Sequence, residues 1–207
     1  MIELNEDIPF LWRLSSHDSE GFCMVSMVVP FMDGDESLEH TIETDVLSFA
    51  SDICNYEEEE LEWNEDDLNL FLKLLANRAK SLAPGAGEAL RIDLADPETI
   101  EIVQIVAAAG FGLALPPEDI LAQTERSYLR ADFDLGSPVS IHTLEGFKRG
   151  VVVDIDDDDV VCVILDPVRV ASPGQFEQIH PYDLLLLKTP DILHPDYTGD
   201  APSGVLH

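Results

Sequence analysis

Residues 135–155 read LGSPVSIHTLEGFKRGVVVDI, and this stretch indicates that the second part of the chain is built from short strands. Its apolar side chains are mostly β-branched, and glycines interrupt it at positions 136, 146 and 150. Five segments of this kind follow one another, at 138–143, 149–156, 160–166, 174–180 and 183–188. Short strands at that spacing, punctuated by glycine and proline, predict a small barrel or sandwich.

The same stretch resembles an SH3-like barrel of the KOW or Tudor type. Gly136 precedes the first strand, and the run Gly150-Val151-Val152 supplies the Gly-x-Val pair of the second. The resemblance covers residues 134–190 and implies a docking module for RNA, DNA or peptides. Residues 134–207 hold 13 acids against four bases, unlike the nucleic-acid-binding versions. We therefore expect no direct binding of nucleic acid.

The first 133 residues predict a mixture of strands and helices. Residues 8–14 and 21–31 favour strands because they are rich in β-branched and aromatic side chains. From Ser37 the apolar positions recur at helical spacing, which predicts a helix over residues 37–53. A short strand is expected at residues 89–94.

Two helix starts are marked by capping residues. Asn64 has the character of an N-cap, with acids filling the first turn after it. Asp96 followed by Pro97 is a second start, and Gly110 is the matching stop. A further helix is expected over residues 116–130, so that the two helices around Gly110 form a packed hairpin.

These patterns predict an α+β fold with three parts. An acidic α+β domain covers residues 1–133, an SH3-like β-barrel covers 134–190, and a C-terminal tail covers 191–207. The chain has 207 residues and 45% hydrophobic content, which is enough apolar surface to build a core.

Composition also bears on the compartment. The start of the chain lacks the basic region of a secretory signal, and no apolar run is long enough to span a bilayer, so no membrane association is expected. Cys23, Cys54 and Cys162 lie far apart and form no CxxC pair. Buried, inert thiols are expected at Cys23 and Cys162. A cytoplasmic location fits these features best.

No pattern for catalysis or metal binding outweighs an ordinary structural explanation. Asp154, Asp156 and Asp158 have the spacing of a calcium loop, but Asp159 stands where that loop needs glycine and Leu165 where it needs glutamate. A turn between two strands explains the acids better. The six histidines show no HxxxH or HExxH spacing. We expect no catalytic residue, no metal and no cofactor.

The most unusual stretch is YEEEELEWNEDD, residues 56–67, because eight of its twelve side chains are carboxylates. Residues 1–67 contain 20 acids and one base, Arg13, whereas the whole chain has a net charge of −31. One interpretation is a solvated helix end followed by first-turn acids. The other is functional: in a helix the eight charges would be spaced at one per roughly 2 Å. Duplex DNA carries one per about 1.7 Å.

The leading hypothesis is therefore a non-enzymatic acidic protein that occupies the basic surface of a nucleic-acid-binding protein or nuclease. DNA mimics of phages or plasmids and the immunity proteins of nucleases act in this way, and the analogy is one of charge. Two alternatives stay open: an adaptor or structural component that docks through the barrel, and a salt-adapted protein of unassigned activity. The oligomeric state also stays open. The predicted partner-binding residues are Glu39, Glu43, Glu57, Glu58, Glu59, Glu60, Glu62, Glu65, Asp66 and Asp67.

Overall fold

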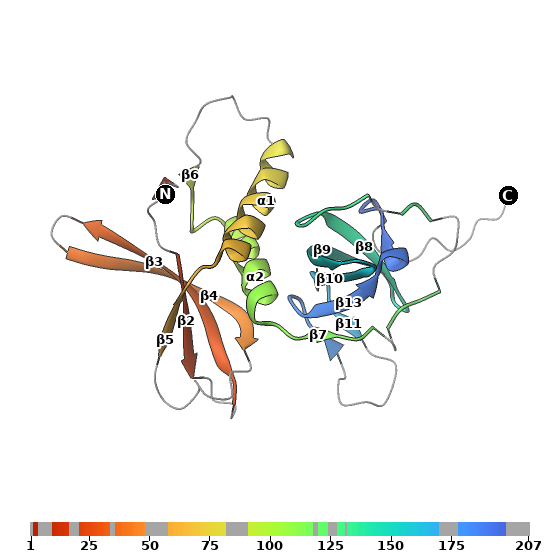
Figure 1. The fold of residues 1–207 in the computed structure, drawn as a ribbon, viewed down its shortest axis with the longest axis horizontal. Coiled ribbons are helices and arrows are strands. Elements are labelled where there is room, and N and C mark those ends of the chain that lie inside the picture. Colours follow the sequence, from red (N-terminus) through yellow and green to blue (C-terminus); the bar gives the residue numbers. More distant parts are fainter. Residues whose placement is uncertain are drawn as a thin grey trace. The chain divides into compact units, whose positions relative to one another are not determined.

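The computed structural model divides the chain into two compact units, residues 1–112 and 113–207 (Figure 1). The structure describes residues 2–3, 10–16, 21–33, 36–48, 58–81, 91–117, 120–123, 128–130, 132–169 and 178–197. Both helices and many strands are present, so the fold is α+β as predicted.

A four-stranded antiparallel sheet in the order β4-β3-β2-β5 forms the frame of the N-terminal unit. Its strands are β2 (Leu11–Ser16), β3 (Cys23–Asp33), β4 (Glu36–Ser48) and β5 (Glu59–Glu62). Helices α1 (Glu65–Ser81) and α2 (Pro97–Phe111) belong to the same unit. The short strands β1 (Ile2–Glu3) and β6 (Arg91–Ile92) pair with each other.

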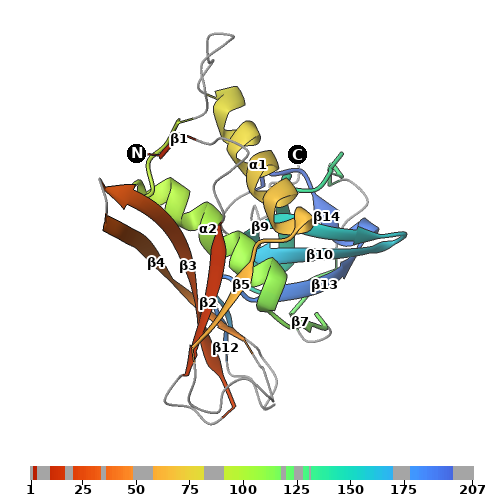
Figure 2. The same cartoon turned by 60° about the vertical axis from the view of Figure 1, so that its left-hand side comes forward.

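The helices cover one face of this sheet. Helix α2 packs against β3 and β4, and α1 packs against α2 (Figure 2). Trp12 of β2 points to this side, because its ring contacts that of Phe111 in α2 at a centroid distance of 5.6 Å. In register with Trp12, Met27 of β3 and Leu61 of β5 face the same way. The apolar core of the unit thus lies between sheet and helices.

Both predicted helix starts are confirmed. The side-chain Oδ1 of Asn64 accepts the backbone N–H of Asp67 at 2.9 Å, which caps α1. Asp96 is the N-cap of α2, and Pro97 is its first residue. Helix α2 ends at Phe111, one residue after the predicted stop, with Gly112 as its C-cap.

The predicted helix over residues 37–53 is wrong over its described part, where strand β4 runs to Ser48. Leu38, Ile42 and Val46 recur every four residues, but even-numbered positions also share one face of a strand. Ile42 and Val46 are buried in alternation with exposed neighbours. Thr44 also lies buried between them, where its hydroxyl donates to the carbonyl of Val25 at 2.6 Å. This polar residue on the buried side concealed the two-residue period.

The C-terminal unit is built on a six-stranded sheet in the order β14-β8-β9-β10-β13-β7. Its strands are β7 (Ala114–Leu115), β8 (Pro138–Thr143), β9 (Gly146–Asp156), β10 (Asp159–Ile164), β13 (Leu184–Lys188) and β14 (Ile192–Leu193). A two-stranded pair joins β11 (Val168–Arg169) to β12 (Gln178–Ile179), and a 3₁₀ turn, η1 (Thr189–Asp191), precedes β14. The strands predicted from the sequence overlap β8, β9, β10 and β13, and the described end of the segment predicted at 174–180 contains β12.

Gly150 of β9 occupies a position where a larger residue would make tight contacts. A Cβ atom there would lie 3.0 Å from Cδ1 of Ile141 and 3.3 Å from the carbonyl oxygen of Val163. The glycine therefore lets β9 pack closely between β8 and β10. The sheet is nevertheless open over the residues that the structure describes, so a closed SH3-like barrel is not confirmed.

The C-terminal unit begins earlier and ends later than residues 134–190. Strand β7 pairs with β13, and Leu121 forms a bridge with Thr143. Strand β14 pairs with β8, so Ile192 and Leu193, which were predicted to be part of the tail, belong to the sheet. No helix forms over the described part of residues 116–130, because Ala122 donates its N–H to His142 instead, at 3.0 Å. The predicted helical hairpin is therefore wrong over the residues that the structure describes.

The cysteines differ from each other. Cys162 is a free, fully buried thiol, as predicted, and burial raises its pKa to about 12. Cys23 is buried but disulfide-bonded, so the prediction of an inert thiol there is wrong. Sequence spacing alone gives no signal for such a bond between distant cysteines. Because disulfides persist in oxidising compartments, Cys23 no longer supports a cytoplasmic location. None of the described helices has the length and hydropathy needed to cross a bilayer.

Candidate functional site

Four glutamates gather on the sheet face that points away from the helices. Trp12 faces the helices, so its neighbour Arg13 points to the opposite side. Arg13 lies in register with Glu60 of β5 and with Ser26 of β3, which in turn lies opposite Glu43 of β4. Two pairs along, and so on the same face, Glu62 lies opposite Leu11. Together with Glu39 of β4, which Arg13 contacts, these carboxylates form what we call the acidic face: Glu39, Glu43, Glu60 and Glu62.

Arg13 lies in the middle of the acidic face and binds two of its members. Its Nη1 and Nη2 donate to the two carboxylate oxygens of Glu39 at 2.8 and 2.7 Å. Its Nε and Nη2 donate to Oε1 of Glu60 at 3.0 and 2.6 Å. Because Glu39 belongs to β4 and Glu60 to β5, one guanidinium connects the two outermost strands of the sheet.

These contacts set the electrostatics of the face. The Arg13 hydrogen bonds hold the pKa of Glu39 below its usual range, and the Glu39 and Glu60 carboxylates raise the pKa of Arg13. The side chain of Arg13 is 20% exposed, whereas those of Glu39 and Glu60 are 48% and 46% exposed. Glu43 and Glu62 are also exposed. The face therefore presents four carboxylates around one guanidinium.

The spacing of the charges differs from the helical hypothesis. Residues 59–62 form a strand, so their side chains alternate between the two faces of the sheet. Successive glutamates on one face of β5 lie about 6.6 Å apart, and the face spans about 14 Å from β4 to β5. Duplex DNA is much denser, at one charge per about 1.7 Å. The DNA-like density expected for residues 57–67 is therefore absent from their described part.

The other predicted partner-binding residues that the structure describes are not among the four carboxylates of the acidic face. Glu59 lies in register with Leu14 and is half-buried on the helix side. Glu58 is exposed just before β5. Glu65 and Asp66 are exposed in the first turn of α1, where the helix dipole stabilises negative charge. Glu57 lies outside the described residues.

Asp67 was predicted to bind a partner, but it is not a surface residue. It is only 7% exposed. Its Oδ2 accepts hydrogen bonds from Nε1 of Trp12 at 3.2 Å and from the backbone N–H of Asn64 at 3.1 Å. Burial raises the pKa of this carboxyl, partly offset by those two hydrogen bonds. Asp67 thus joins α1 to β2 inside the unit.

Arg13 is the residue of the site that the sequence-based prediction left out. Its signal was present, because it is the one base among the first 67 residues, beside 20 acids. A cation isolated in such a segment is expected to attract the nearest carboxylates. Which carboxylates these are depends on strand pairing. The sequence did not reveal that pairing, because residues 37–53 were expected to form a helix.

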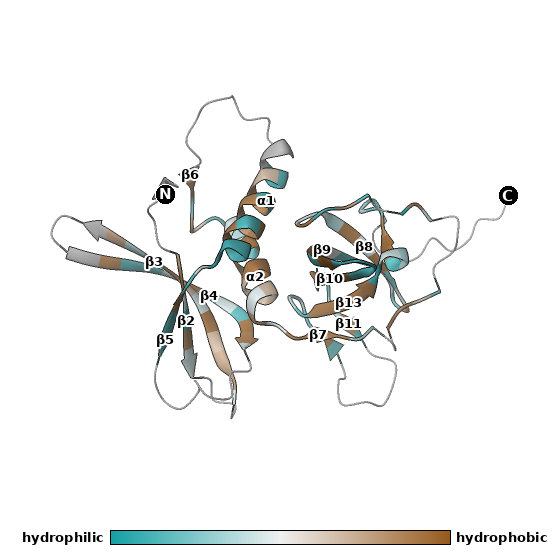
Figure 3. Cartoon of the chain, viewed as in Figure 1, coloured by the Kyte–Doolittle hydropathy of each residue, from teal (hydrophilic) through white to brown (hydrophobic). Residues whose placement is uncertain are grey.

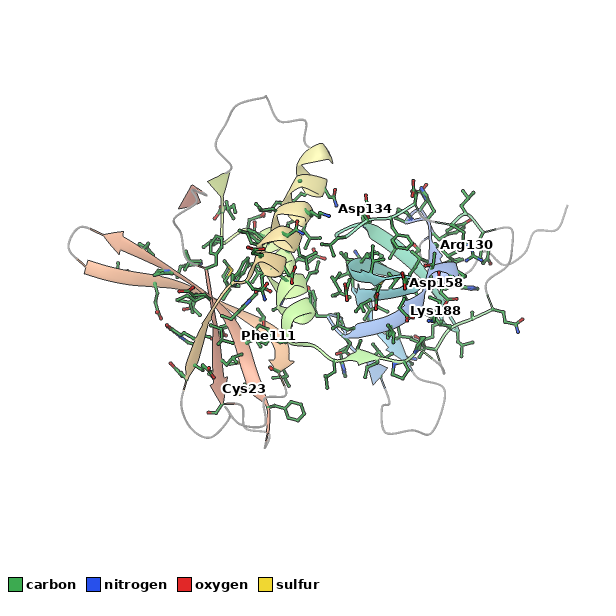
Figure 4. All side chains as sticks on the ribbon, viewed as in Figure 1. Cys23, Phe111, Arg130, Asp134, Asp158 and Lys188 are labelled. Carbon is green, nitrogen blue, oxygen red and sulfur yellow. The ribbon has the colours of Figure 1, made fainter. Side chains whose placement is uncertain are left out.

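A second group of acids lies at the β9–β10 turn of the other unit. Asp156 and Asp159 pair across the strands, and Asp157 adopts a positive φ of 54° in the turn between them. Lys188 of β13 forms an ion pair with Asp159, and the carbonyl of Asp158 accepts the N–H of Thr189 at 3.0 Å (Figure 4). This is a hairpin turn, as the sequence favoured over a calcium loop. Within the described residues, no three metal-binding side chains converge on one point.

The residues of strand β5 and helix α2 differ in hydropathy. Strand β5 is strongly hydrophilic along the ribbon, whereas much of α2 is hydrophobic (Figure 3).

Comparisons with known proteins assign no family to the chain. No protein-family model matches it, and no curated protein matches it with significant similarity.

Proposed function

We propose that the protein is a non-enzymatic binding protein whose acidic face takes a basic surface of a nucleic-acid-binding protein. The observation that carries the proposal is the placement of Glu39, Glu43, Glu60 and Glu62 on one side of a single sheet. Their strands, β4 and β5, belong to one hydrogen-bonded sheet through β3 and β2, so the charges are held at fixed separations. The backbone that bears the glutamates is therefore ordered before a partner binds, so binding does not have to order it.

The uneven distribution of charge supports binding over adaptation to salt. Residues 1–67 carry 20 of the 42 acids and only one of the 11 bases. Solvent adaptation would act on both units alike, whereas a binding surface concentrates its field on one of them. A field of one sign also accelerates the approach of a partner of the opposite sign.

Acids on outer strands have a structural explanation as well. Strands β4 and β5 are the edges of the sheet, and charged side chains on edge strands prevent pairing with other chains. Edge protection requires charge along the strand edges but no complementarity to a partner. If the acidic face binds a partner, a charge at Glu43 or Glu62 matters more for binding than an equal charge elsewhere. If the acids only protect the edges, it does not.

Competition with DNA tests the proposal. A linker histone, as a basic DNA-binding probe, is bound to labelled duplex DNA and titrated with the protein. The double variant Glu43→Gln/Glu62→Gln is compared with Asp154→Asn/Asp156→Asn, which removes the same charge from exposed residues of the other unit. Neither pair contacts Arg13 in the described contacts.

We expect the wild type and the Asp154/Asp156 variant to release DNA at similar concentrations. The Glu43/Glu62 variant should need several-fold more protein, because each lost rim charge weakens a charge-driven complex modestly. Equal displacement by the two variants would mean that only net charge matters, and the acidic face would then have no specific role.

A second candidate function is that of an adaptor that docks through the C-terminal unit. We propose an SH3-like barrel as the fold of this unit. The adaptor function is favoured by Leu186, which is 40% exposed on β13 beside the half-buried Val161 of β10. Loss of binding in Leu186→Glu, with unchanged binding in the Glu43/Glu62 variant, would favour this function over the first.

A further inference from the structure

We infer that Arg13 is an internal competitor on the acidic face, occupying two of its four carboxylates and thereby weakening the binding of arginine-rich partners. This inference rests on the proposed function. It concerns how strongly the face binds and which cation it prefers.

The guanidinium of Arg13 uses all of its nitrogens to bind Glu39 and Glu60. All three guanidinium nitrogens of Arg13 donate to carboxylate oxygens, at 2.6 to 3.0 Å. The contact with Glu39 is two-pronged, which is the strongest arrangement for an arginine and a carboxylate. A cation from a partner must displace these bonds before it can use Glu39 or Glu60.

Displacement is feasible because the carboxylates are accessible. About half of each glutamate side chain is exposed, at 48% for Glu39 and 46% for Glu60. The ion pairs therefore lie at the solvent boundary, where a pair is weak enough to exchange partners. Arg13 itself is more covered, at 20% exposure, and remains close to both carboxylates when one bond opens.

The same geometry indicates the preferred partner cation. Glu39 is already arranged to accept two parallel N–H bonds, which a guanidinium provides and a lysine ammonium does not. Releasing Glu39 and Glu60 should therefore benefit an arginine-rich partner more than a lysine-rich one.

A purely structural role for Arg13 predicts the opposite result. Arg13 connects β4 to β5, so a residue that only orders the sheet would, when lost, loosen the face and weaken binding. A competitor, when lost, strengthens binding. The direction of the change therefore separates the two roles.

The test uses fluorescent oligoarginine and oligolysine peptides of equal length and measures their dissociation constants by anisotropy at low salt. Arg13→Lys keeps the formal charge but loses the two-pronged contact, and Arg13→Gln removes the cation. Lys73→Gln on α1 is the control, because it removes an equal charge from an exposed residue. Thermal unfolding of each variant shows that it is folded, and Arg13→Lys carries the test if Arg13→Gln is not.

We expect Arg13→Gln to bind oligoarginine about threefold more tightly than Lys73→Gln does, and Arg13→Lys to bind it about twofold more tightly than wild type. The gain for oligolysine should be smaller. No gain over Lys73→Gln, or weaker binding by both Arg13 variants, would overturn the inference. Failure of the proposed function shows separately, as oligoarginine binding that is equal for Glu43→Gln/Glu62→Gln and Asp154→Asn/Asp156→Asn.

Discussion

The indole Nε1 of Trp12 donates a 3.2 Å hydrogen bond to Oδ2 of Asp67, linking the central part of the sheet to the first turn of α1. The same oxygen accepts the N–H of Asn64, while the N–H of Asp67 donates to Asn64 Oδ1. These reciprocal bonds satisfy two backbone donors at the start of the helix. Asp67 therefore has a structural role, although it lies in the most acidic stretch of the chain.

Substitutions at Asp67 should distinguish the effect of its charge on stability from the effect of its hydrogen bonds. Burial raises its folded-state pKa, so the ionised form is penalised in the fold and wild-type stability falls as pH rises through that pKa. Asp67→Asn keeps an acceptor oxygen and does not titrate. Its free energy of unfolding, relative to wild type, should therefore increase from pH 4 to pH 7 in urea titrations followed by tryptophan fluorescence.

The matched control is Asp67→Ala, which removes the acceptor as well. Relative to Asp67→Asn, which does not titrate either, it should lose about 1–2 kcal/mol at every pH, because the backbone N–H of Asn64 and the buried indole N–H of Trp12 are left without their acceptor. A stability difference between Asp67→Asn and wild type that is constant with pH would contradict the buried, penalised carboxylate.

Gly110 of α2 is close to the same carboxylate. A Cβ atom at Gly110 would lie 3.3 Å from Oδ1 of Asp67, a tight contact. Alanine favours a helix by up to about 1 kcal/mol over glycine. Gly110→Ala should therefore stabilise the Asp67→Ala protein more than the wild type, by about 0.5–1 kcal/mol in a double-mutant cycle. Equal effects in the two backgrounds would show that the two residues are not coupled.

The segment that follows β13 is expected to be essential to the C-terminal unit. Ile192 and Leu193 are fully buried and pair with β8, while Tyr197 stacks on Phe147 at 5.0 Å. Ending the chain after Asp191 should lower the melting temperature by at least about 10 °C, since two buried aliphatic side chains are lost. A chain that ends after Tyr197 is the control and should melt close to the full-length protein. Equal melting of the two truncations would mean that residues 192–197 are a dispensable tail.

The parts of the fold that were predicted correctly are those with local signals. Asn64 and the Asp96-Pro97 pair mark helix starts through short-range capping chemistry, which does not depend on the rest of the chain. Residues 37–48 lacked such a marker. Their apolar spacing fits both a helix and a strand, and pairing with β3, a tertiary contact, decides between the two.

The site could be predicted in composition but not in arrangement. The excess of acids near residue 60 is visible in the sequence, yet it includes Asp67, which is buried, and Glu59, which faces the helix side. Arg13 lies 26 residues from Glu39 and 47 from Glu60. Such contacts follow from the strand order β4-β3-β2-β5, which local patterns do not encode.

The most direct test of the acidic face as a binding surface is the association rate constant measured by stopped flow with the linker histone probe. The wild-type rate should fall at least about tenfold between about 50 and 500 mM salt, as the Debye length shrinks from near 14 to near 4 Å. At low salt, Glu43→Gln/Glu62→Gln should associate about threefold more slowly than Asp154→Asn/Asp156→Asn, while dissociation changes little. Equal association rates for the two charge-matched variants, or a rate indifferent to salt, would contradict the account.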